Sequence, residues 1–246
     1  ISEKGNQLLL STETKGLWLF DTETGQTQAI NIDAETNTFY QAIHHNNSYY
    51  VISMGPEHLY RYDIKTAKTT LIAKNVKNNL LLASENRIYF NDSNRLLYLD
   101  INTNQVQQFE AINEKIIAAS NINNTVIMAS KNHLFSINAH GEITQKDISS
   151  PITAITPHND QNSMLSVNLL GEITKREVAT LKKLDSNFSN VEKSRYRTLL
   201  HDSSGVLWLG NNRGIQQHIE TTVNNHPIIF DTNFSAIETE VYQREL

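Results

Sequence analysis

Residues of the types that hydrolases use gather near the C-terminal end of the chain, in the segment LLHDSSGVLWLGNNRG (199–214). His201, Asp202 and Ser203 have the side chains of a base, an orienting acid and a nucleophile. A catalytic triad needs these side chains to converge in space, but consecutive residues on a strand point to opposite faces. The spacing therefore favours a turn-capping role for Asp202, and we predict no catalytic residue in the chain.

Two further motifs fail as cofactor sites. The adjacent histidines His44 and His45 would point to opposite faces of a strand, and no histidine at ligand spacing accompanies them. The glycines of GNNRG (210–214) lack the strand-to-helix context of a phosphate-binding loop. The chain contains no cysteine, which excludes disulfides, thiolate metal sites and a cysteine nucleophile. We expect neither a metal ion nor an organic cofactor.

The composition limits the partners. The 246 residues carry a formal net charge of -5, with no basic stripe to neutralise phosphates, so we predict no nucleic-acid partner. No apolar run approaches the roughly 20 residues of a membrane span. The chain begins ISEKGNQLLL, without an initiator methionine. We therefore interpret it as a fragment of a longer protein that meets the membrane only through a segment outside these residues.

The elements that must position these residues repeat along the chain. Short alternating runs recur with a nearly constant ending: GLWLFD ends at Asp21, HLYRYD at Asp63, RLLYLD at Asp100 and HLFSIN at Asn138. Weaker copies are GEITKRE, near Glu177, and GIQQHIE, near Ile219. The period of about 40 residues is the length of one four-stranded propeller blade.

The second repeat shows how four strands fit into one period. Its segments are FYQAIHH (39–45), SYYVISM (48–54), HLYRYDI (58–64) and KTTLIAK (68–74). Every second side chain of such a run is apolar, as a half-buried strand requires, and turn-forming residues fill the gaps. Glycine is scarce, and asparagine is expected at many positive-φ positions. We therefore predict an all-β chain, a single β-propeller domain over residues 1–246.

The phase of the repeats bears on the number of blades. The first repeat begins with QLLLST (7–12) as its second strand, so no innermost strand precedes it. The last repeat is followed by FSAIETEV (234–241), which resembles the innermost strands of the other repeats. Pairing of this C-terminal strand with the first blade would close the propeller and remove exposed sheet edges. This predicts six blades, with a seven-bladed or longer array as the alternative.

The best-preserved repeat has the pattern D-x-x-G-x-L-W-x-G-x-x-x-G. The matching positions are Asp202, Gly205, Leu207, Trp208, Gly210 and Gly214. This pattern resembles the repeat of two-component regulator propellers, the extracytoplasmic sensor halves of hybrid histidine kinases and related signalling proteins. In physical terms, Asp202 caps the turn, Gly205 supplies a positive φ and Trp208 packs between neighbouring blades. The middle repeats keep the period but lack the signature glycines.

The resemblance implies a sensory or recognition domain of a bacterial membrane-bound signalling protein, on the periplasmic side of the inner membrane. It also implies an oligosaccharide or other small-molecule ligand and a homodimer, and any enzymatic activity would lie elsewhere in the parent chain. A binding funnel is expected where the connections between blades meet the turns between second and third strands. The candidates there could stack on a sugar ring or grip its polar groups: Tyr40, Lys131, Arg195, Tyr196, Asn212 and Arg213.

Two other functions stay open on the sequence. A protein-interaction scaffold without a small ligand would show an exposed apolar patch. A propeller enzyme, such as a lyase or a quinone-dependent dehydrogenase, would show histidines or carboxylates that converge in the funnel with perturbed pKa values.

Overall fold

The fold is a β-propeller of six four-stranded antiparallel blades, as the sequence predicts. The structure is a computed structural model that describes residues 2–12, 14–93, 95–186, 188, 194–219 and 228–229. Among these residues all regular structure is β, and no helix is found. The chain divides into two compact units. The first comprises Ile1–Pro151 and Ala179–Leu181, and the second comprises Ile152–Val178 and Lys182–Leu246.

The first unit contains four sheets. The first sheet consists of β1 (Ser2–Lys4), β2 (Gln7–Thr12), β3 (Gly16–Asp21) and β4 (Thr27–Ile30). The second consists of β5 (Phe39–His45), β6 (Ser48–Ser53), β7 (His58–Asp63) and β8 (Lys68–Lys74). The third consists of β9 (Val76–Ser84), β10 (Arg87–Asp92), β11 (Arg95–Asp100) and β12 (Gln105–Gln108). The fourth consists of β13 (Ala118–Ile122), β14 (Thr125–Ala129), β15 (His133–Ile137) and β16 (Ile143–Asp147).

The second unit contains the remaining two sheets. The fifth sheet consists of β17 (Ile152–Pro157), β18 (Ser163–Asn168), β19 (Ile173–Glu177) and β20 (Lys183–Leu184). The sixth consists of β21 (Thr198–His201), β22 (Val206–Asn211), β23 (Gly214–Ile219) and β24 (Ile228–Ile229).

The alternation of apolar residues builds a core on both sides of a sheet. In β6, Tyr49 and Val51 pack with a cluster that includes residues of the first sheet. Tyr50 and Ile52 of the same strand pack with a cluster that includes Phe90 of the third sheet. Because successive side chains of a strand point to opposite faces, one strand supplies two cores. This explains why β6 has four consecutive buried apolar residues, 49–52.

The first blade differs from the sequence prediction. Ser2–Lys4 forms β1 and pairs in antiparallel fashion with β2, with Ser2 opposite Leu9 and Lys4 opposite Gln7. The first blade therefore has an innermost strand from its own N-terminal end. The prediction that none precedes Gln7 is wrong, because three residues suffice for this short pairing. The C-terminal segment 234–241, predicted to close this blade, lies outside the described residues.

The recurring aspartates at the ends of the third strands cap turns. Asp21 accepts hydrogen bonds from the backbone N–H groups of Glu23 and Thr24, at 3.1 and 2.8 Å. Asp63 and Asp100 make the same kind of contact in the second and third sheets. These bonds explain the constant ending of the repeats, since a carboxylate two or three residues before an N–H group fits this turn.

Asparagine occupies many of the left-handed backbone positions, as predicted. Positive φ angles occur at Asn46, Asn75, Asn104, Asn123 and Asn124. Asparagine tolerates this region better than most residues, so the chain can form tight turns with few glycines.

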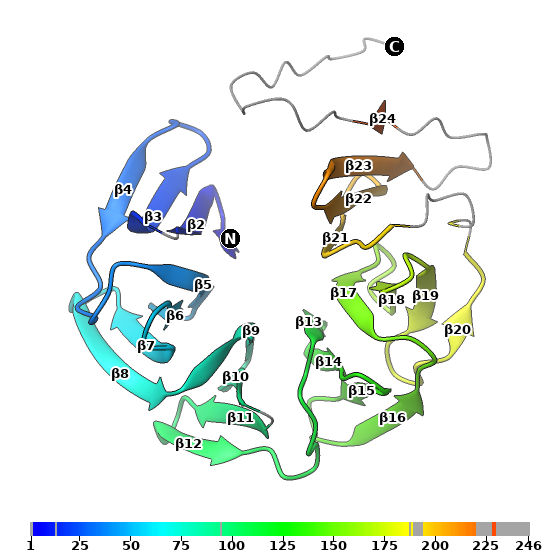
Figure 1. Cartoon of the computed structure of the whole chain (residues 1–246), viewed down its shortest axis with the longest axis horizontal. Coiled ribbons are helices and arrows are strands. Elements are labelled where there is room, and N and C mark those ends of the chain that lie inside the picture. Colours follow the sequence, from blue (N-terminus) through cyan, green and yellow to red (C-terminus); the bar gives the residue numbers. More distant parts are fainter. Residues whose placement is uncertain are drawn as a thin grey trace. The chain divides into compact units, whose positions relative to one another are not determined.

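Each sheet has two ends, which carry different connections of the chain. We call the end that carries the connections between sheets and the turns between second and third strands the crossing face; in the fourth sheet it includes residues 130–132. The opposite end, with the first–second and third–fourth turns, is the turn face; in the same sheet it includes 123–124 and 138–142. Figure 1 shows the innermost strands β5, β9 and β13 of the first unit following one another, with β8, β12 and β16 at the rim.

Candidate functional site

The crossing face of the first unit carries two of the predicted ligand-binding residues. Tyr40 lies near the start of β5, and the strand register skips it, since Phe39 pairs with Ser53 and Gln41 pairs with Ile52. Such a bulge turns a side chain out of the regular pleat, and the Tyr40 side chain is 38% exposed. Lys131 is exposed in the turn between β14 and β15.

The crossing face of the second unit carries three more predicted residues. Arg195 precedes β21, and Asn212 and Arg213 form the turn between β22 and β23; all three are exposed. Hydrogen bonds hold the two segments side by side, because the N–H of Arg197 donates to the carbonyl of Gly210 at 2.8 Å. Two cations and an amide are thus presented on adjacent segments, a set that suits carboxylate or hydroxyl groups.

Tyr196 does not belong to this surface. Its side chain is only 1% exposed and packs in the core between the fifth and sixth sheets, with Leu165 and Leu207 among its neighbours. Its hydroxyl donates to Oε1 of Gln216 at 2.6 Å. The prediction that Tyr196 stacks on a ligand is wrong, because the ring already fills the space between two sheets of the second unit.

Asp202 organises the turn from which the sequence motif starts. Oδ1 of Asp202 accepts hydrogen bonds from the N–H groups of Ser204 and Val206, both at 2.9 Å, and from Oγ of Ser204 at 2.6 Å. Oδ2 accepts the indole Nε1–H of Trp208 at 2.7 Å. The side-chain hydrogen bonds from Ser204 and Trp208 lower the pKa of Asp202 to about 2. The carboxylate is therefore ionised, and both of its oxygens accept hydrogen bonds from residues 204–208 of the same sheet.

The glycines of the motif have separate structural reasons. Gly205 has a φ of 87°, in the region that disfavours other residues. Gly210 instead lies opposite Thr198 in the ladder between β21 and β22. A Cβ at Gly210 would clash with Oγ1 of Thr198. Trp208 is expected between neighbouring blades, but its indole N–H is bound within its own sheet and its side chain is half-buried.

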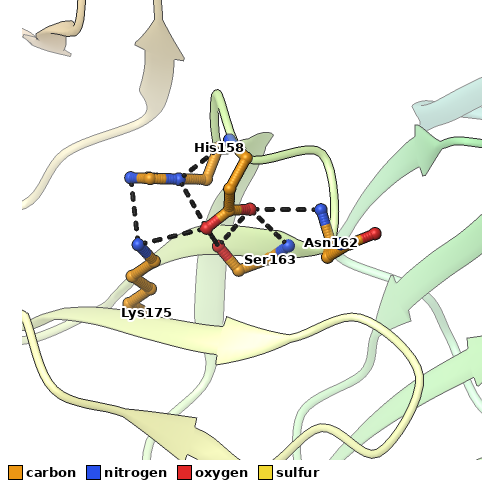
Figure 2. A network of polar contacts seen from close by, with 5 residues as sticks. His158, Asn162, Ser163 and Lys175 are labelled. Atoms are coloured by element: carbon orange, nitrogen blue, oxygen red, sulfur yellow. Dashed lines mark hydrogen bonds and ion pairs between the residues drawn. The ribbon is translucent and has the colours of Figure 1, made fainter.

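A polar cluster that the sequence analysis misses lies on the turn face of the second unit (Figure 2). Asp160, in the turn between β17 and β18, accepts hydrogen bonds from Oγ of Ser163 on both carboxylate oxygens, at 2.8 and 2.7 Å. Its Oδ2 also lies 3.2 Å from Nζ of Lys175 and 3.0 Å from Nδ1 of His158. Burial alone would raise the pKa of Asp160, but these hydrogen bonds, led by those from Ser163, lower it below its ordinary value.

The cluster joins two sheets rather than activating a nucleophile. The imidazoles of His158 and His201, from the fifth and sixth sheets, stack with centroids 4.7 Å apart. A catalytic serine must give its proton to a base in order to attack, and the Asp160 carboxylate that accepts the Ser163 hydroxyl is a weak base because its pKa lies below the ordinary value. The arrangement is therefore that of a structural network. His158, Asp160 and Ser163 are close in sequence, but the contacts with Lys175 and His201 come from other strands, so no local motif reveals the network.

Comparisons with known proteins find proteins of similar fold but no matching sequence. No model of a known protein family matches the sequence, and no curated protein sequence matches it. Solved structures do match. The extracellular domain of a protein of B. thetaiotaomicron described as a hybrid two-component system has a TM-score of 0.68 and 14% identity, over 89% of this chain and 33% of that one. A second such domain from B. thetaiotaomicron has a TM-score of 0.64 and 17% identity, over 86% of this chain and 32% of that one.

A third solved structure also shares the fold. Hsv2 of Kluyveromyces lactis has a TM-score of 0.64 and 10% identity, over 90% of this chain and 73% of its own. At such identities the likeness establishes the fold and leaves the activity to be argued from the site. The chain spans about a third of the length of the two bacterial domains. Among the described residues there is no helix long and apolar enough to cross a membrane.

Proposed function

We propose that this chain is the ligand-recognition propeller of a bacterial membrane-bound signalling protein of the two-component regulator propeller family. The observation that carries the proposal is the fold likeness to extracellular domains of proteins described as hybrid two-component systems, at a TM-score of 0.68 in one case. The motif from Asp202 to Gly214 supports the same family. On this proposal the domain acts on the periplasmic side of the inner membrane.

The ligand surface we propose is the crossing face, which is described for each unit by itself. In the first unit it offers the exposed ring of Tyr40 and the ammonium group of Lys131. In the second unit it offers the guanidinium groups of Arg195 and Arg213 and the amide of Asn212. An aromatic ring stacks on the apolar face of a sugar, and guanidinium and amide groups bind its hydroxyl or carboxylate substituents. The chemistry suits an oligosaccharide or another small polar ligand.

The role we propose for the domain is recognition rather than catalysis. The titratable cluster around Asp160 lies on the turn face, away from the proposed ligand surface, and its groups are bound to one another. Binding would act by changing the packing of a homodimer. A ligand can do so only if its affinity differs between two arrangements of the subunits.

A thermal-shift screen with oligosaccharide classes tests the proposal. A ligand at 100 times its Kd stabilises a protein by about 2.7 kcal/mol, which gives a clear rise in Tm. We expect Lys131→Ala to reduce the rise. Lys146→Ala is the matched control, because Lys146 is an exposed lysine on the outer strand β16 of the same sheet. Absence of a shift with every glycan class, or an equal response in both variants, would refute the proposed ligand surface.

A further inference from the structure

A hollow of about 270 Å³ lies between the third and fourth sheets, both in the first unit. It opens on the turn face, the end opposite the proposed ligand surface, and turn residues of both sheets line it. Small-molecule sites have volumes of about 300–1,000 Å³, so this hollow suits a ligand of few atoms.

Groups of opposite charge line this hollow: the guanidinium of Arg87 and the carboxylates of Asp100 and Glu85. Arg87, at the start of β10, lies directly opposite Asp100, at the end of β11, in the antiparallel ladder. Opposed residues of opposite charge commonly pair across strands. Both residues belong to the described part of the chain, and no contact within 4 Å joins their charged atoms there. The two charges still attract each other. The hydrogen bond with Tyr89 and the charge of Asp100 help to raise the pKa of Arg87. The backbone N–H of Thr103 and the charge of Arg87 help to lower the pKa of Asp100. The closest contacts of each charge are with other neighbours.

Arg87 is held on an aromatic platform. Its Cζ lies 4.6 Å from the centroid of the Tyr98 ring, and its Nη1 lies 3.4 Å from the hydroxyl of Tyr89. Tyr89 is buried in the core between the third and fourth sheets. A guanidinium stacked in this way keeps donors at its edge for a planar acceptor such as a carboxylate.

Asp100 is held by its turn. One carboxylate oxygen, Oδ1, accepts the N–H groups of Asn102 and Thr103, at 2.9 and 3.0 Å. These contacts fix the direction of the carboxylate, whose charge lies at the wall of the hollow. An ammonium group is the natural partner of such a fixed negative charge.

The rest of the lining is polar at the mouth and apolar beneath. Asn86, Asn102 and Asn124 are exposed around the opening, whereas Val126 and Ile137 are each 2% exposed. The amides can bind a polar side group of a ligand, and the two apolar residues limit its depth.

We propose that this hollow binds a small zwitterion of the α-amino-acid type, with its carboxylate on Arg87 and its ammonium group on Asp100. A simple anion would meet the carboxylates of Asp100 and Glu85, and a simple cation would meet the guanidinium. Only a ligand that carries a negative and a positive charge can pair with both the guanidinium and a carboxylate of the lining. The inference goes beyond the proposed signalling role, since the site can be occupied whatever the output of the parent protein.

Isothermal titration with L-glutamine, whose side-chain amide matches the asparagine-lined mouth, tests the charge pattern. Two matched probes each lack one charge: N-acetyl-L-glutamine has no ammonium group and L-glutamine amide has no carboxylate. We expect L-glutamine to bind and each blocked probe to bind at least about tenfold more weakly, as expected for a lost charge-assisted hydrogen bond. Glucose, a neutral sugar of similar size, should not compete. Absence of L-glutamine binding, or equal binding of a blocked probe or of glucose, overturns the proposal.

Two variants test which residue binds the carboxylate of the ligand and which binds its ammonium group. Arg87→Gln should remove the preference for L-glutamine over its amide, and Asp100→Asn should remove the preference over the acetylated form. Asparagine also caps such turns, so Asp100→Asn keeps the fold. Asp63→Asn is the matched control, because Asp63 caps the corresponding turn of the second sheet but does not line the hollow. Unchanged preferences in both pocket variants, or an equal loss in Asp63→Asn, would show that these charges do not select the ligand.

Discussion

The indole Nε1–H of Trp208 donates a hydrogen bond of 2.7 Å to the Oδ2 of Asp202, six residues earlier in the chain. This contact ties the second strand of the sixth sheet to the turn that precedes it. The two signature residues of the repeat are therefore partners of each other. The contact gives these two motif positions a structural role that is independent of ligand chemistry.

Trp208→Phe should weaken the sixth sheet by at least about 1 kcal/mol, because a smaller ring replaces the indole and one charge-assisted hydrogen bond is lost. Urea unfolding followed by circular dichroism measures the loss. Trp18→Phe is the matched control, since the Trp18 indole donates to a backbone carbonyl, that of Lys15, rather than to a carboxylate. An unchanged stability of Trp208→Phe would show that the contact with Asp202 contributes nothing.

The stability of the second unit should fall below about pH 4. Asp202 has a folded pKa of about 2, below the ordinary value of 3.8. A group with a lowered folded pKa stabilises the fold fully above its unfolded pKa, and this contribution is lost as the pH falls through the folded value. The window for Asp202 therefore lies between about pH 4 and pH 2, and Asp160 adds to the loss in the same direction.

Trp208 fluorescence in a Trp18→Phe background reports on this transition, because the chain has only two tryptophans. The urea midpoint should drop between pH 5 and pH 2.5, within the range where carboxylates titrate. Asp202→Asn, which cannot titrate, should show a smaller drop. An equal drop in this variant would mean that other carboxylates cause the acid sensitivity.

Gly210→Ala should cost about 1 kcal/mol, because the new Cβ would force Thr198 out of its rotamer. Thr198→Ala removes the clashing hydroxyl and should restore the stability in the double variant. The four proteins form a double-mutant cycle measured by urea unfolding. If Gly210→Ala were equally costly with alanine at position 198, the glycine would be required for another reason.

Tyr196→Ala should destabilise the second unit by about 3–5 kcal/mol, because a buried aromatic ring leaves a cavity between two sheets. Tyr196→Phe should cost about 1 kcal/mol, because the ring is kept and the hydrogen bond to Gln216 is lost. Thermal unfolding and ligand titration of the phenylalanine variant separate the two roles. If Tyr196→Phe kept normal stability but bound the ligand more weakly, Tyr196 would have to contact the ligand after all.

The sequence predicts the fold well because its signals are local. Alternation and turn residues place the strands of the second blade within one residue of their observed ends. The aspartate endings at Asp21 and Asp63 are equally local, because a carboxylate binds N–H groups two or three residues ahead. These features depend only on residues that are close together in the sequence.

The site depends on contacts that no local pattern contains. The bulge that exposes Tyr40 arises from the register of β5 against β6, and the burial of Tyr196 depends on how the fifth and sixth sheets pack. The cluster at Asp160 draws on His201 from the next sheet through the stacked His158. The hollow beside Arg87 likewise forms only where two blades meet. Such features are visible only once the sheets are assembled.

The most direct test of the sensing role is the output of the complete parent protein in membrane vesicles. A compound that raises the Tm of this propeller is added to either side of the membrane, and phosphorylation or transcription output is measured. A sensing propeller should change the output when the compound reaches its side of the membrane, and the output should stay constant when the compound is confined to the other side. An output that stays constant while the propeller is saturated with the compound would contradict the sensing role.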